Sequence, residues 1–176
     1  RRSELLGLRW KDVDLLMATM RVVQTLQKLN KGEYIYQEPK TQAGRRTIAL
    51  SPVSCLELRT HREDQERDAN ILGIDITDDT LIFSHPDASP RLPSTLTLAF
   101  RRLADRVGLQ GVRLHDLRHT MASLYLQQGV SPKTVAERLG HSSVVITLDL
   151  YSHVIPDMQQ YAADAVANLL KREPQT

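Results

Sequence analysis

The sequence predicts a single α+β domain that is mostly helical and carries a small three-stranded antiparallel sheet. Between residues 18 and 51, β-branched and apolar residues form short runs separated by turn signals, a pattern typical of strands. After residue 52, apolar residues recur at spacings of three and four, which indicates amphipathic helices. The 176 residues, 41% of them hydrophobic and 25% charged, suit one globular domain with one core.

The predicted sheet follows a short helix over residues 1–8. The turn signals LNKG and TQAG separate the extended runs, and glycine supplies the permissive backbone in each turn. Three strands are therefore expected, over residues 18–26, 33–38 and 45–51.

The remaining elements are predicted to be helical. Ser51 with Pro52 and Ser131 with Pro132 are cap and first-turn pairs, and Ser94 is the expected cap of a helix of about 14 residues that ends near Gly108. Gly140 is expected to stop the helix that Ser131 begins. The predicted helical segments are residues 52–72, 94–108, 115–128, 132–139, a short stretch over 142–149, and a last helix over 157–170.

Composition excludes several classes of protein. The single cysteine, Cys55, rules out an intrachain disulfide and a cysteine-based zinc site, and it fits a reducing cytoplasm. No apolar stretch approaches the roughly 20 residues that cross a bilayer, so no membrane association is expected. The net charge of +2 is too small to establish a nucleic-acid partner by itself.

The densest polar cluster is RLHDLRH, residues 113–119, at the start of an otherwise apolar helix. His115 and Arg118 are three residues apart and therefore share a helix face. An imidazole and a planar guanidinium can converge there on one small anion, and a phosphate is the natural fit. Further along the chain, His141 follows a helix stop and precedes Tyr151 by ten residues.

Five segments together resemble a known family. In chain order they are RRSELLGLRW, PKTQAGRRTIAL, HDLRHTMAS, LGHSS and LYSHV. This ordered set, which spans nearly the whole chain, resembles the catalytic domain of the tyrosine recombinases, the phage-integrase family. The resemblance implies the fold of that catalytic core and site-specific cleavage and rejoining of DNA for a phage or other mobile element, without metal or cofactor. Because the chain begins inside a predicted helix and without Met, residues 1–176 are expected to be a fragment that lacks an N-terminal DNA-binding domain.

The resemblance assigns a phosphate clamp. Arg1 and Arg118 match the family's two arginines, which would hold the non-bridging phosphate oxygens with fixed planar donors. His141 matches the position that adds a further hydrogen bond there. Glu4 matches an acidic position that is expected to support the arginines.

The resemblance also assigns the groups that transfer protons and attack. Tyr151 matches the nucleophile, whose phenol, with a reference pKa of about 10, needs a proton acceptor and a masked phosphate charge. His115 is the expected general base, and Lys40 is the expected general acid for the 5′ leaving oxygen, with Lys31 as a nearby competitor. The product would be a 3′-phosphotyrosyl link to DNA.

Double-stranded DNA is the expected partner. Arg45 and Arg46 are interpreted as solvated hairpin charges with a DNA-facing role, because the same hairpin carries Lys40. The apolar stripe of residues 157–170 either docks on its own domain or, as the family implies, on a neighbouring protomer in a DNA-bound homotetramer. Without DNA a monomer is expected.

Two other interpretations use the same residues. His115, His119 and His141 could form a three-histidine zinc site, but the cation Arg118 lies between the ligands. Residues 115–139 also read as a helix-turn-helix, and therefore as a non-catalytic DNA-binding module. That alternative leaves the motif positions outside this segment unexplained.

Overall fold

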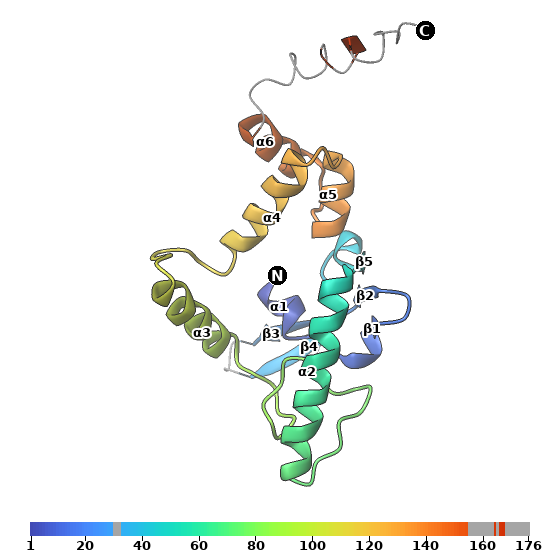
Figure 1. The fold of residues 1–176 in the computed structure, drawn as a ribbon, viewed down its shortest axis with the longest axis vertical. Coiled ribbons are helices and arrows are strands. Elements are labelled where there is room, and N and C mark those ends of the chain that lie inside the picture. The colour runs from blue at the N-terminus through green and yellow to red at the C-terminus, as the bar shows by residue number, and fades with distance from the viewer. Residues whose placement is uncertain (30–32, 155–163, 165, 168–176) are drawn as a thin grey trace, which may run out of the picture.

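The computed structural model describes residues 1–29, 33–154, 164, 166 and 167 (Figure 1). The strands gather with the N-terminus and α2, whereas α4, α5 and α6 form a separate helical group at the other end (Figure 1). The predicted turn at residues 29–32 and the predicted last helix over 157–170 lie largely outside the described residues.

The strands form two antiparallel sheets. A three-stranded sheet is present, as predicted, but its strands are β1 (Val13–Asp14), β2 (Thr19–Val22) and β5 (Arg46–Ala49), in the order β1-β2-β5. The second sheet pairs β3 (Thr25–Lys28) with β4 (Tyr34–Gln37). The membership predicted for the sheet was therefore wrong, because the run over residues 18–26 is two strands.

A contact with the N-terminal helix explains this division. The helix α1 (Arg2–Leu5) packs against β3, and the Gln24 side chain donates a hydrogen bond of 2.8 Å to the Gly7 carbonyl. A Cβ at Gly7 would lie 2.9 Å from the Gln24 carbonyl oxygen, so only glycine permits this approach. The chain therefore leaves β2 at residues 23 and 24 and passes across α1 into β3.

The helices follow the predicted order. Ser51 and Ser131 cap α2 and α5 by accepting hydrogen bonds from the backbone N–H groups of Ser54 and Thr134. The predicted cap at Ser94 was wrong, since Pro93 already occupies the first turn of α3 and Leu92 precedes it. The α-helices are α2 (Pro52–Ile71), α3 (Pro93–Arg106), α4 (Asp116–Gln127), α5 (Pro132–Leu139) and α6 (Val145–Val154), and the 3₁₀ turns are η1 (Trp10–Asp12) and η2 (Gln42–Gly44).

Two apolar clusters support the two ends of the molecule. Leu8, Trp10 and Ile82 form the first, and the Trp10 indole N–H donates to the buried Gln65 side chain of α2 at 2.7 Å. The second cluster joins α4 to α5 through Ala122, Leu126 and Val135, and α6 packs on both helices. In the part of the chain that the structure describes, no helix combines the length and the apolar character that a membrane span requires.

Candidate active site

The C-terminus of α5 is the structural centre of the site. Gly140 adopts the left-handed conformation, with φ of +67°, and ends the helix. The N–H of Gly140 donates to the Glu137 carbonyl at 3.0 Å, and the N–H of His141 donates to the Ala136 carbonyl at 2.9 Å. The next three carbonyls, of residues 138 to 140, lie at the negative end of the helix and accept from other partners.

Three guanidinium groups bind these consecutive carbonyls, and each arrives from a different element. β5 and α4 supply one arginine each and the third, Arg1, is the N-cap residue of α1, so segments far apart in sequence meet at one helix end. The bonds run from Arg46 Nε to the Arg138 oxygen at 2.8 Å, from Arg118 Nη2 to the Leu139 oxygen, and from Arg1 Nη2 to the Gly140 oxygen at 2.6 Å.

Glu4 joins two of these arginines. Its side chain is only 6% exposed, and its carboxylate accepts from Arg1 Nη1 at 2.7 Å and from Arg46 Nη2 at 2.7 Å. Burial acts to raise the pKa of Glu4, but the hydrogen bond from Arg46, the charge of the Arg1 α-amino group, the charge of Arg46 and the hydrogen bond from Arg1 lower that pKa to about 2. Glu4 thus supports the arginines as a buried carboxylate, in agreement with the expectation for this position.

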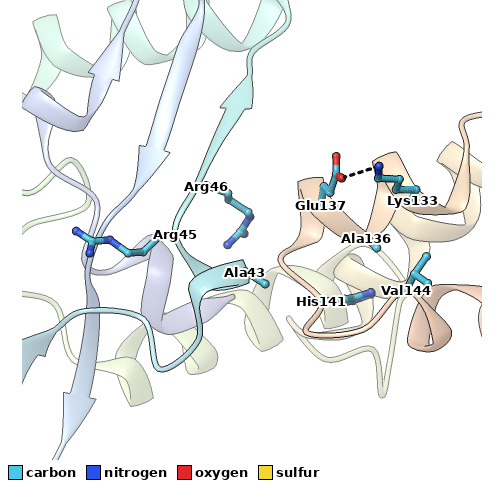
Figure 2. Close-up of a pocket in the computed structure, with 8 residues that line it drawn as sticks. All are labelled: Ala43, Arg45, Arg46, Lys133, Ala136, Glu137, His141 and Val144. Atoms are coloured by element: carbon cyan, nitrogen blue, oxygen red, sulfur yellow. Dashed lines mark ion pairs between the residues drawn. The ribbon is translucent and has the colours of Figure 1, made fainter.

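Arg46 was wrongly predicted to be a solvated charge. Its side chain is 10% exposed and bonds to Glu4, to the Gly44 carbonyl and to the Arg138 carbonyl. Arg45 directly precedes β5, and its side chain points away from that of Arg46 (Figure 2). It forms an exposed ion pair with Glu38 at 3.2 Å. The strand period contained the missed signal, because Arg46 shares the face of β5 that buries Ile48.

The arginines give the site a strongly positive potential. Burial, followed by the neighbouring charge of Arg1, lowers the pKa of Arg118 to about 10. Burial, followed by the charges of Arg118 and Arg1, lowers the pKa of His141 to about 4. His141 is therefore a neutral imidazole at pH 7, and Arg118 remains a cation.

His115 lies at the N-cap of α4, exposed, with its ring 5.0 Å from that of His119 in an edge-to-face contact. Burial and then the proximity of His119 and Arg118 lower the pKa of His115, which favours the neutral imidazole that a proton acceptor requires. Within the described ranges, no group of three histidine, cysteine or acidic side chains is placed to hold a metal ion, so the zinc interpretation gains no support.

Lys40 lines a cavity that borders the arginine cluster. It follows β4 and is exposed, and the cavity, of about 370 Å³, is also lined by Arg1, Glu4 and Gly140. The competing Lys31 lies outside the described residues. A second cavity, of about 280 Å³, is lined by residues of η2 and β5 on one side and of α5 on the other, and His141 also lines it (Figure 2).

Position 151 belongs to α6, which continues to Val154 and does not end near residue 149 as predicted. The Tyr151 side chain lies outside what the structure describes. One helical turn before it, Thr147 is fully buried and its hydroxyl lies 2.8 Å from His141 Nδ1. The backbone of α6 therefore connects position 151 to the His141 side of the site.

Comparison with known proteins identifies the family. Residues 1–157 match the profile of the phage integrase family. The chain belongs to the phage integrase family. It is 34% identical to the ICEBs1 integrase of Bacillus subtilis (strain 168) over 170 residues, which are 97% of this chain and 46% of that protein. It is 29% identical to a XerC-like tyrosine recombinase of Caldanaerobacter subterraneus subsp. tengcongensis over 180 residues, with 96% and 46% covered.

The fold of this phage-integrase domain is also that of solved relatives. The integrase of transposon Tn1549, in complex with transposon right end DNA, superposes with a TM-score of 0.78 at 24% identity, covering 95% of this chain and 55% of that chain. The predicted fold of an integrase catalytic core, mostly helical with a small three-stranded antiparallel sheet, is thus confirmed, and the two-stranded sheet of β3 and β4 is an addition to it. The chain spans about half the length of the relatives that it matches.

Gly140 offers a test of how closely the arginine cluster of this phage-integrase domain is packed. A Cβ at Gly140 would lie 2.7 Å from Arg46 Nη1 and 2.9 Å from the Ala43 carbonyl oxygen, whereas at Gly129, also at positive φ, a Cβ meets nothing within 4 Å. Gly129→Ala should therefore cost about 1 kcal/mol from backbone strain alone, and Gly140→Ala roughly 3 kcal/mol. Urea denaturation measures the loss in the free energy of unfolding for both variants. Equal losses would show that close packing against Arg46 does not contribute to the cost at Gly140.

Glu4 gives this domain a characteristic pH dependence. Because the folded-state pKa of Glu4, about 2, lies below its ordinary 4.5, the stabilisation is complete above pH 4.5 and is lost as the pH falls through 2. The shift corresponds to roughly 3 kcal/mol. Glu4→Gln should lower the free energy of unfolding by this order at pH 7, and the difference from the wild type should shrink toward pH 2.

Urea denaturation between pH 7 and 2 measures that difference. The matched control is Glu38→Gln, whose partner Arg45 is solvent-exposed, so its loss should be below about 1 kcal/mol. A Glu4→Gln loss that is small or independent of pH would contradict the role given to the buried carboxylate.

Proposed function

We propose that this chain is the catalytic domain of a tyrosine-type site-specific DNA recombinase of a phage or other mobile element. One observation carries the proposal: Arg1 and Arg118 bind adjacent carbonyls beside the neutral His141, in a site that Lys40 and Arg1 line together. The membership of the chain in the phage integrase family and its relatives among integrases and tyrosine recombinases support the same conclusion.

The charge balance of the site favours a phosphodiester as its ligand. Arg1, Arg46 and Arg118 meet there, and Glu4 is the carboxylate that hydrogen-bonds to two of them. Like charges in a partly buried site repel, and a bound anion relieves this repulsion. Guanidinium groups match the geometry of phosphate oxygens, so a phosphodiester of DNA would complete the cluster.

The residues then divide the reaction among them. The Tyr151 phenol attacks the phosphorus as His115 accepts its proton, while Arg1, Arg118 and the Nε2–H of His141 stabilise the charge on the non-bridging oxygens. The bond from phosphorus to the 5′ oxygen breaks, and Lys40 supplies the proton that this oxygen needs. A 3′-phosphotyrosyl bond remains, and a 5′-hydroxyl of another strand reverses the attack to rejoin DNA. The chain's own side chains supply every proton transfer in this scheme.

The partners follow from this activity. Double-stranded DNA is the substrate, and the related Tn1549 integrase was solved with transposon DNA. Arg45, which is exposed on the hairpin beside Lys40, is suited to a contact with the DNA backbone. Residues 1–176 form the catalytic domain of a longer recombinase with an N-terminal DNA-binding domain, and the segment over 157–170 links protomers into a tetramer on DNA.

Replacing Tyr151 with Phe tests the covalent step. The full-length protein, incubated in EDTA with a nicked suicide duplex from the ends of its genetic element, should form an adduct visible on a denaturing gel. Tyr151→Phe should abolish this adduct and leave duplex binding intact, because only the nucleophilic oxygen is lost. Tyr125→Phe on α4 is the matched control, because its hydroxyl bonds to the Arg138 side chain, and it should form the adduct normally. An adduct in Tyr151→Phe would refute the assignment, and tight binding without any adduct in the wild type would favour the helix-turn-helix module.

Replacing Arg118 with Lys tests the phosphate clamp. A lysine keeps the charge but cannot present two parallel donors, so the single-turnover rate of adduct formation should fall on the order of 100-fold. Arg101→Lys, an exposed position on α3, should leave that rate unchanged. A rate within about twofold of the wild type in Arg118→Lys would show that bidentate geometry is not required.

A further inference from the structure

Thr147 is a buried polar residue to which the reaction scheme gives no role. Its side chain is fully buried at the start of α6, where this helix packs on α4 and α5. Its hydroxyl oxygen lies 2.8 Å from Nδ1 of His141. The backbone N–H of His141 is itself bound to the Ala136 carbonyl, so the histidine is held at both its backbone and its ring.

The hydroxyls of two other threonines inside helices behave differently. Thr97 on α3 and Thr120 on α4 donate to the carbonyl four residues earlier, at 2.9 and 3.0 Å. Thr147 makes no such bond, and His141 is the single hydrogen-bond partner of its hydroxyl among the described residues. The side chain of Thr147 is thus directed at the histidine and not at its own helix.

Whether Thr147 or His141 donates this hydrogen bond follows from the need of the buried Thr147 hydroxyl hydrogen for an acceptor. A hydroxyl carries one hydrogen, and a buried donor without an acceptor costs about 1–3 kcal/mol. If Nδ1 of His141 donated, the hydrogen of the Thr147 hydroxyl would lack an acceptor among the described residues. If the hydroxyl donates to Nδ1, the bond satisfies both groups.

We infer that Thr147 is a positioning residue that donates its hydroxyl hydrogen to Nδ1 of His141 and so holds the imidazole in the tautomer that carries its proton on Nε2. In this tautomer Nε2 is a hydrogen-bond donor, and in the opposite tautomer it would present a lone pair to an anionic oxygen. The part of the inference that concerns the phosphate rests on the proposed function, whereas the tautomer is a property of the protein alone.

The surroundings of His141 keep its ring singly protonated, so the position of its one N–H determines which nitrogen can donate. Burial and the charges of Arg118 and Arg1 lower the pKa of His141 to about 4, so the ring carries a single N–H near neutral pH. A singly protonated imidazole has two alternatives, and its neighbour selects between them. Thr147 is the neighbour within hydrogen-bond distance of Nδ1.

Nitrogen NMR of the ring measures the tautomer directly. Long-range ¹H–¹⁵N spectra of the ¹⁵N-labelled chain at pH 7, with the His141 signals assigned by their loss in His141→Gln, should show Nδ1 without and Nε2 with a proton. Thr147→Val should give a tautomer mixture or shift the proton to Nδ1, Thr147→Ser should keep the wild-type pattern, and Thr120→Val is the matched helical control. A protonated Nδ1 in the wild type, or an unchanged pattern in Thr147→Val, would overturn the inference, and the wild-type spectrum is decisive even where the valine variant does not fold.

Adduct formation by the full-length protein provides the second readout. Thr147→Val should slow the single-turnover rate about tenfold, as is common for residues that orient a functional histidine, and Thr147→Ser should restore it. In a His141→Gln background the valine substitution should add little, because its effect passes through the ring. Additive losses would overturn the inference. A wild type without adduct would refute the proposed function and leave the NMR result standing.

Discussion

The binding of three guanidinium groups to the last carbonyls of α5 is the interaction on which the site depends. Arg46, Arg118 and Arg1 take the oxygens of three consecutive residues, and they bring β5, α4 and α1 to one point. The helix end supplies both orphan acceptors and the negative end of the dipole, so it orients the cations without neutralising them. The carbonyls thus hold the arginines in place while their positive charge remains available to a ligand.

The excess of arginine charge that suits this site to an anion also lowers the stability of the fold. Desolvation and mutual repulsion act on the arginines, as the lowered pKa of Arg118 shows, and Glu4 relieves only part of this by binding Arg1 and Arg46. Complete neutralisation by protein carboxylates would stabilise the fold and remove the potential that attracts an anion. A site with an excess of positive charge is therefore consistent with a ligand that carries the missing negative charge.

The residues of this site that lie within the motif strings were predictable from the sequence. The motif order predicted that Arg1, Arg118 and His141 come together, and the structure places them at one helix end. The partners of Arg46 and Thr147 were not predicted. The strand period indicates only that Arg46 shares a face with the buried Ile48, and its backbone partner lies 92 positions away; Thr147 meets the His141 ring six positions away only because the chain turns between α5 and α6.

The sheet illustrates the same limit. Residues 18–26 have continuous strand propensity, and the tertiary contact between Gln24 and Gly7 lies where they divide into β2 and β3. The caps of α2 and α5 were predicted correctly because Ser51 and Ser131 act on N–H groups within their own first turn.

The bond from Arg1 to Gly140 spans 139 positions and has a consequence for the folding pathway. Contacts of such sequence separation form slowly, because the entropy of closing the intervening loop is lost before the contact stabilises the fold. A nascent or partly folded chain has no paired arginines at the end of α5, so the capacity to nick DNA that we propose would arise only with the completed domain.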